Sequence, residues 1–151
     1  MTNFTSGASR LGKMVRAGVA LPAYRVICLG NDGKAYLSSF ESGNVFGVTT
    51  KACAGDNSGV SWVGAGNLAV FTAAGVITKG AKLVVENTGS GLVSAWTVTG
   101  EVYEFPSTGD EARTSAMLSQ LVKLRNYVGF ALEAASSSGD TFLGYFNPKG
   151  L

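Results

Sequence analysis

Short runs of apolar and β-branched residues alternate with turn residues along most of the chain. The turn signals recur about every ten residues, a spacing typical of a sandwich or barrel of antiparallel strands. The predicted strands are 24–29, 34–38, 45–50, 59–63, 68–72, 82–86, 92–98, 101–105, 126–133 and 141–146. The pattern therefore predicts a mainly β protein with an antiparallel β-barrel or β-sandwich fold.

One segment of this pattern occurs twice. Gly47–Asp56 begins with a glycine in an apolar run, continues through alanines and ends in Gly-Asp, and Gly129–Asp140 repeats this order. A second predicted strand follows each copy, at 59–63 and at 141–146. The chain is therefore predicted to use one β-hairpin-like unit twice.

Two glycine-containing segments carry more specific expectations. Asn31-Asp32-Gly33 lies between two predicted strands and predicts a type I′ hairpin turn, because Asp-Gly tolerates the positive φ angles of that turn. Gly64–Ala69 matches the G-x-G-x-x-A pattern of dinucleotide-binding loops, but that motif must open a helix. The following residues favour a strand, so we interpret Gly64–Ala69 as a hairpin connection.

A helical period appears once, before the last predicted hairpin. Apolar residues in Thr114–Arg125 recur at helical spacing, and Asp110 and Glu111 precede them, where carboxylates favour a helix N-terminus. These apolar residues are Met117, Leu118, Leu121, Val122 and Leu124. We predict one short helix around 110–123; the alternative is that Leu121–Arg125 already belongs to the sheet. Met117, Leu121 and Leu124 are then either core residues or an oligomer contact.

The chain has 151 residues, enough for one domain with a substantial core. We predict an extended N-terminal arm at 1–22 and a single β-barrel or sandwich domain at 23–151. Residues 1–31 contain bases and no acid; the bases are Arg10, Lys13, Arg16 and Arg25. This basic arm is either an ordinary flexible terminus or a docking arm for an acidic surface. A nucleic-acid arm is usually denser in Lys and Arg.

The residue types present argue against catalysis. The chain contains no histidine, which removes the commonest general base and metal ligand. Its two cysteines, Cys28 and Cys53, lie among apolar or small residues and are predicted to be buried free thiols. We expect no catalytic residues, no cofactor and no metal, because structural zinc sites use four Cys or His ligands.

Localisation is predicted from the absence of targeting signals. Met1–Thr5 lacks the features of a signal peptide, and no apolar run reaches the roughly 20 residues that span a bilayer. We therefore expect a soluble protein made in a cytoplasm, with no membrane partner. Only 15% of the residues are charged, which together with the many glycines suits a β protein with many tight turns, and also suits a surface partly covered by partners.

The C-terminal copy of the repeat carries a family resemblance. Tyr127-Val128-Gly129-Phe130-Ala131-Leu132-Glu133-Ala134-Ala135, followed by Gly139-Asp140, resembles the small capsid cement (decoration) proteins of tailed bacteriophages. The resemblance covers roughly residues 20–147, while 106–125 resembles an insertion and the arm has no counterpart.

The resemblance implies a non-enzymatic virion protein on the outer surface of the expanded head. Such proteins typically form trimers and stabilise contacts between major capsid subunits, with no direct contact to nucleic acid. The residues expected to contact the capsid or sister subunits are Arg10, Lys13, Arg16, Met117, Leu121 and Leu124.

A second class of function is also considered, a β-barrel module that binds oligosaccharide or nucleic acid. Nucleic-acid platforms need exposed aromatic residues interleaved with bases. The aromatic residues of this chain lie mostly in predicted strands, and bases are sparse around them. We therefore assign them to the core or to a subunit interface.

Overall fold

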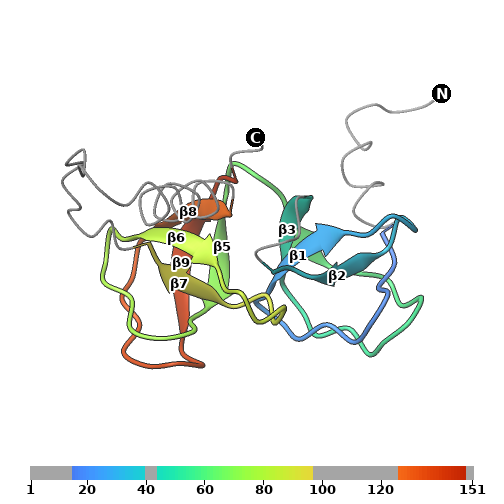
Figure 1. Cartoon of the computed structure of the whole chain (residues 1–151), viewed down its shortest axis with the longest axis horizontal. Coiled ribbons are helices and arrows are strands. Elements are labelled where there is room, and N and C mark those ends of the chain that lie inside the picture. The colour runs from blue at the N-terminus through green and yellow to red at the C-terminus, as the bar shows by residue number, and fades with distance from the viewer. Residues whose placement is uncertain (1–14, 40–43, 97–125, 149–151) are drawn as a thin grey trace, which may run out of the picture.

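The computed structural model describes residues 15–39, 44–96 and 126–148, which form two antiparallel sheets side by side (Figure 1). The first sheet, in the order β2-β1-β3-β4, contains β1 (Val26–Leu29), β2 (Ala35–Leu37), β3 (Val45–Thr49) and β4 (Trp62–Val63). The second sheet, in the order β5-β9-β8-β6-β7, contains β5 (Asn67–Thr72), β6 (Lys82–Val85), β7 (Val93–Ala95), β8 (Tyr127–Ala131) and β9 (Thr141–Phe146). We call the parts of the molecule built on these sheets lobe 1 and lobe 2.

This architecture confirms the predicted fold class, a mainly β protein with antiparallel sheets in a sandwich-like arrangement. Each predicted strand within the described ranges contains an observed strand, although 59–63 shortens to the two residues of β4. The predicted helix around 110–123 and the predicted strand 101–105 lie outside the described residues. No helix long and apolar enough to cross a membrane occurs in the described part of the chain.

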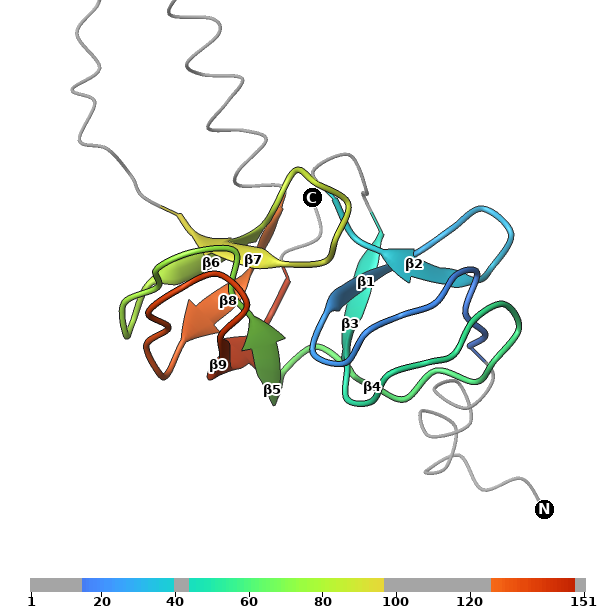
Figure 2. The same cartoon turned by 90° about the horizontal axis from the view of Figure 1, so that it is seen from below.

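The two lobes repeat the same strand pairing. In lobe 1, Ile27 pairs with Gly47 and the register shifts directly after Ile27. In lobe 2, Leu83 pairs with Gly129 and the register shifts directly after Leu83. The register therefore places β1, β2, β3 and β4 in the same relation as β6, β7, β8 and β9 (Figure 2).

The loops repeat as well. Leu21 forms an antiparallel bridge with Cys53 in lobe 1, and Ile77 forms the same bridge with Ala135 in lobe 2. The predicted repeat is thus confirmed, and it is part of a longer duplication that extends from residue 16 to residue 63 and from residue 72 to residue 145.

The two Gly-Asp pairs that suggested the repeat are not structurally equivalent. Asn57 donates its N–H to the carbonyl of Ala17, as Gly139 does to the carbonyl of Ala73. Both residues are left-handed, with φ of 63° and 92°. Asn57 can replace glycine here because its short polar side chain tolerates this conformation. The alignment of Asp56 with Asp140 is therefore wrong, since Asp56 precedes Asn57 and Asp140 follows Gly139.

Two turn predictions need correction. The predicted hairpin between β1 and β2 is confirmed, but only Gly33 of its central residues has a positive φ, 76°, whereas a type I′ turn needs two. The N–H of Gly33 donates to the carbonyl of Gly30 at 3.0 Å, so a type I turn precedes a left-handed glycine. Gly64–Gly66 is not a hairpin connection, because it joins β4 of lobe 1 to β5 of lobe 2.

Lobe 2 holds the larger core. Phe71 of β5 is fully buried against Phe142 and Phe146 of β9, with ring centroids 5.8 and 6.3 Å apart. These side chains face inward because the pleat points alternate residues of β9 to one face of the sheet. The same core also contains Leu83, Val85, Val93 and Val128.

A smaller core fills lobe 1 and includes the described end of the predicted arm. Ala17 and Leu21 are buried against Ile27 and Ala35. Arg16 forms a bridge with Gly59, just as Thr72 of β5 pairs with Thr141 of β9. Residues 16–21 are therefore part of lobe 1, while residues 1–14 of the predicted arm lie outside the described residues.

The lobes are joined by backbone hydrogen bonds at Tyr24. Its N–H donates to the carbonyl of Thr49 in lobe 1 at 2.8 Å, and its carbonyl accepts from the N–H of Thr72 in lobe 2 at 3.0 Å. Tyr24 has a φ of 60°, an uncommon value for a residue with a Cβ atom. Its counterpart in lobe 2 is Gly80, which has a φ of 84° and donates to Ala131 in the same way.

The connection between β6 and β7 reaches lobe 1 and fixes the junction. Gly91 donates its N–H to the carbonyl of Ser38 and accepts from the N–H of Val26, at 3.1 and 2.9 Å. Arg25 donates from Nη1 to the carbonyl of Ser90 at 2.9 Å. Lobe 2 therefore holds the β1–β2 hairpin by its backbone as well as by side-chain packing.

Candidate contact surfaces

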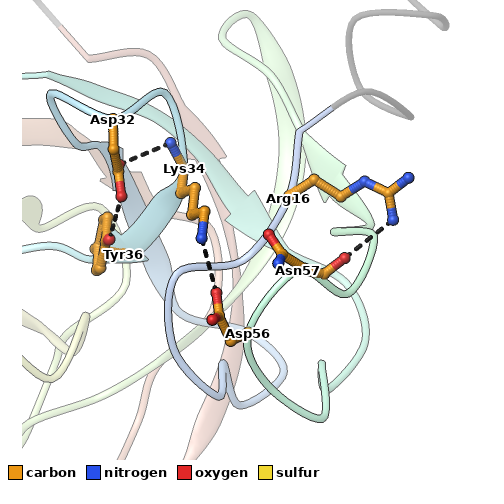
Figure 3. A network of polar contacts seen from close by, with 6 residues as sticks. All are labelled: Arg16, Asp32, Lys34, Tyr36, Asp56 and Asn57. Atoms are coloured by element: carbon orange, nitrogen blue, oxygen red, sulfur yellow. Dashed lines mark hydrogen bonds and ion pairs between the residues drawn. The ribbon is translucent and has the colours of Figure 1, made fainter.

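A network of polar contacts connects three segments at the edge of lobe 1 (Figure 3). Asp32 in the β1–β2 turn accepts a hydrogen bond from the hydroxyl of Tyr36 at 2.7 Å and another from the backbone N–H of Lys34 at 3.0 Å. The Nζ of Lys34 lies 2.9 Å from Oδ1 of Asp56 in the loop between β3 and β4. Arg16 donates from Nη1 to the backbone carbonyl of Asn57 at 2.9 Å.

The same contacts determine the electrostatics of the network. The hydrogen bond from Tyr36 and the N–H of Lys34 lower the pKa of Asp32, and the Asp32 carboxylate raises the pKa of Tyr36. The hydrogen bond to Asp56 raises the pKa of Lys34. The shifts of Asp32 and Lys34 favour their charged forms, which are the forms that make these contacts. The Lys34–Asp56 ion pair that links the two loops is exposed, and such pairs stabilise a fold only weakly.

The electrostatics of this network do not favour Tyr36 as a nucleophile. Its hydroxyl donates to the Asp32 carboxylate, but the raised pKa of Tyr36 and the lowered pKa of Asp32 both oppose proton transfer between them. Among the described residues there is also no group of three His, Cys, Asp or Glu residues that could hold a metal ion. Cys28 and Cys53 are buried and free, as predicted.

Of the predicted contact residues, only Arg16 lies in the described part of the chain, and its guanidinium is held at Asn57. The predictions for Arg10, Lys13, Met117, Leu121 and Leu124 concern residues outside the described ranges. The structure therefore leaves these five assignments as predictions.

An aromatic row crosses the outward face of the lobe 2 sheet. Phe130 of β8 is 37% exposed and lies next to Tyr145 of β9, with ring centroids 5.4 Å apart. Lys82 of β6 is opposite Phe130 and places its Nζ 5.6 Å from the ring centroid of Trp96. Trp96 in turn lies 6.4 Å from Tyr127. A face of this composition suits contact with another protein, where aromatic residues are enriched.

A second apolar feature is a hollow of about 150 Å³ at the junction of the lobes. Tyr24 lies beside it, together with Val48 and Val63 of lobe 1 and Leu68 and Val70 of lobe 2. Leu68 is 56% exposed. The lining also includes Thr49 and Thr50 but no carboxylate, amine or thiol, so the mainly apolar hollow suits an apolar side chain.

The sequence pattern assigns the aromatic residues to the core or to a subunit interface without separating the two. The separation was available in Thr141–Phe146, where strict alternation puts Phe142 and Phe146 on one face and Tyr145 on the other. For Phe130 the face could not be predicted, because a register shift in β8 interrupts the alternation and no residue pattern indicates that shift.

Comparisons with known proteins give a likeness among solved structures. No protein-family model matches the chain. No curated protein sequence matches it either. Among solved structures, the chain is similar to the head fiber gp8.5 N base in bacteriophage phi29, with a TM-score of 0.57 and 14% sequence identity. The match covers 91% of this chain and 93% of that chain, and it shows a shared fold.

Proposed function

We propose that this protein is a non-enzymatic structural protein of a bacteriophage virion that binds the outer surface of the head. The observation that carries the proposal is the fold shared with the phi29 head fiber base over 91% of this chain. The resemblance of Tyr127–Asp140 to capsid cement proteins supports the same class of function from the sequence. The absence of histidine from the chain fits a role without acid–base catalysis.

In finer detail, the proposed role is that of a trimeric cement or decoration protein. Three copies attached to the major capsid protein would stabilise neighbouring capsid subunits, and the threefold repetition of weak contacts would provide avidity without a deep pocket. Arg10, Lys13 and Arg16 are the proposed capsid contacts of the arm. Met117, Leu121 and Leu124 are the proposed contacts to the capsid or to sister subunits.

Cosedimentation of the purified protein with expanded, DNA-free heads of its phage tests this role. We expect saturable binding to the heads, and loss of the protein from the pellet when heads are omitted. A chain that lacks residues 2–14 is the variant that tests the arm, because Ala17 and Leu21 are buried in lobe 1 and must be kept. Binding that is unchanged by this deletion would refute the role of Arg10 and Lys13.

The alternative is an oligosaccharide- or nucleic-acid-binding module, and titrations separate it from the proposed role. Binding to DNA that weakens steeply with salt, together with no binding to heads, would contradict the virion assignment and favour the alternative. The aromatic row of lobe 2 contains one base, Lys82, whereas a stacking platform for nucleic acid combines its aromatic residues with a positively charged groove.

A further inference from the structure

Because the two lobes repeat each other, the outward faces of their sheets can be compared. In lobe 1, the outward face of the sheet does not meet solvent but packs against the core of lobe 2. Val26 and Val48 are fully buried there, at 0% and 1% exposure, and Val45 and Val63 pack beside them. Two parts of lobe 2 flank this valine face. Strand β5 contacts β3 and β4, and Gly91 of the β6–β7 connection forms backbone hydrogen bonds with Val26 and Ser38. The outward face of lobe 1 is therefore an interface with the next lobe.

The strand register identifies the equivalent face of lobe 2 residue by residue. The pair Val26 and Val48 corresponds to Lys82 and Phe130. By the same register, Val45 corresponds to Tyr127 and Val63 to Tyr145. The face that is buried in lobe 1 is thus the aromatic row in lobe 2, where Phe130 and Lys82 are exposed.

The inward faces of the two sheets also differ between the lobes. In lobe 2 the inward face is closed by the valines of lobe 1, and Val128 is fully buried. Its register counterpart in lobe 1 is Phe46, which is half-buried and lies 4.9 Å from the half-buried ring of Trp62. Leu37 completes this partly open side of the lobe 1 core. The inward face that the valines of lobe 1 cover in lobe 2 is therefore partly open in lobe 1.

We propose that the aromatic row of lobe 2 docks onto the open side of lobe 1 in a second copy of this chain. The contact between copies would repeat the contact between lobes, with Phe130 and Tyr145 taking the places of Val48 and Val63. Such an interface joins two different surfaces, so it assembles copies head to tail and closes into a ring when the rotation permits. The proposal rests on the duplication and goes beyond capsid binding, because it concerns assembly in solution.

Light scattering on the full-length protein and two variants tests the docking. Phe130→Glu places a charge in the aromatic row, and Phe46→Glu places one in the open side of lobe 1. Wild-type protein at about 100 µM is expected to have a mass of several times 15.5 kDa. Each variant alone is expected at the mass of one copy, with association weakened about 100-fold, the effect of losing a central interface residue. Val76→Glu, at a 69% exposed position on neither surface, is the matched control and should keep the wild-type mass.

Mixing the two variants gives the decisive result. Each variant retains one intact surface, so an equimolar mixture is expected to form a dimer and nothing larger, which a symmetric interface would not produce. Circular dichroism confirms folding, and Leu37→Glu replaces Phe46→Glu if the latter does not fold. A monomeric wild type, variants that keep the wild-type mass, or a mixture that stays monomeric would each overturn the proposal. None of these measurements involves heads, so a failure here is distinct from a failure of capsid binding.

Discussion

At Gly129 the backbone of a neighbouring strand leaves no room for a side chain. Its φ is +144°, and a Cβ atom added there would lie 1.8 Å from the backbone carbonyl oxygen of Tyr145 and 2.9 Å from the adjoining carbonyl carbon. The neighbouring atoms belong to the backbone of β9, so no side-chain rotation relieves the clash. Gly129→Ala must therefore move β8 away from β9 or change its backbone conformation.

The expected cost has two parts. A strained backbone conformation costs on the order of 1–3 kcal/mol, and forcing an extra methyl into a packed site costs a similar amount. We therefore expect Gly129→Ala to lower the free energy of unfolding by about 3 kcal/mol or more. For a chain of this size that corresponds to a fall in Tm of roughly 10 °C.

Gly139→Ala is the matched control, because it lies in the same repeated segment and also has a positive φ, +92°, but an added Cβ meets nothing within 4 Å. Only the left-handed backbone cost of about 1–2 kcal/mol applies to it. Urea unfolding followed by tryptophan fluorescence measures both variants. Equal destabilisation by the two substitutions would refute the argument that the approach of β9 makes Gly129 necessary.

Two further predictions concern the core and the pH dependence of stability. Phe71→Ala removes a fully buried ring that packs on Phe142 and Phe146, and should lower the free energy of unfolding by about 3–5 kcal/mol in urea titrations; a loss below about 1 kcal/mol would contradict the assigned core. Hydrogen bonds from the Ser136 hydroxyl and from the N–H groups of Ser136 and Ser137 lower the pKa of Asp140, while Tyr36 and Lys34 lower that of Asp32. A carboxyl whose pKa is lower in the folded state than in the unfolded state stabilises the fold at pH values above its unfolded-state pKa. This stabilisation is lost as the pH falls toward the folded-state pKa, so stability should fall as pH drops through and below the ordinary value of 3.8. Asp140→Asn should make thermal unfolding less dependent on pH in that range, and an unchanged dependence would contradict this.

The strands were predictable from the sequence because the period-two alternation and the turn residues are local signals. The last hairpin, β8 to β9, follows its predicted ranges closely, since Thr141–Phe146 alternates strictly between buried and less buried positions. The partition of the strands into two sheets was not predictable. Gly64–Gly66 indicates a change of direction, but which sheet the next strand joins depends on long-range packing.

The full extent of the duplication was also beyond sequence reasoning. Tyr24 corresponds to Gly80, and Val26 to Lys82, pairs that share neither size nor chemistry. What the lobes share is backbone conformation and hydrogen bonding, which many residue types can satisfy. The aromatic row of lobe 2 could not be predicted either. An aromatic residue in a predicted strand indicates burial, but it does not distinguish burial in the core from burial against a partner.

The unequal lengths of two equivalent connections have a practical consequence. Lobe 1 joins β2 to β3 between Leu37 and Val45, while lobe 2 joins β7 to β8 between Ala95 and Tyr127. The register of the flanking strands is the same in both lobes despite this difference. The entropic cost of closing a loop rises by only about 0.6 kcal/mol for each doubling of its length. The β2–β3 connection is therefore a suitable site at which to graft a foreign peptide for display, with the strands on either side keeping their pairing.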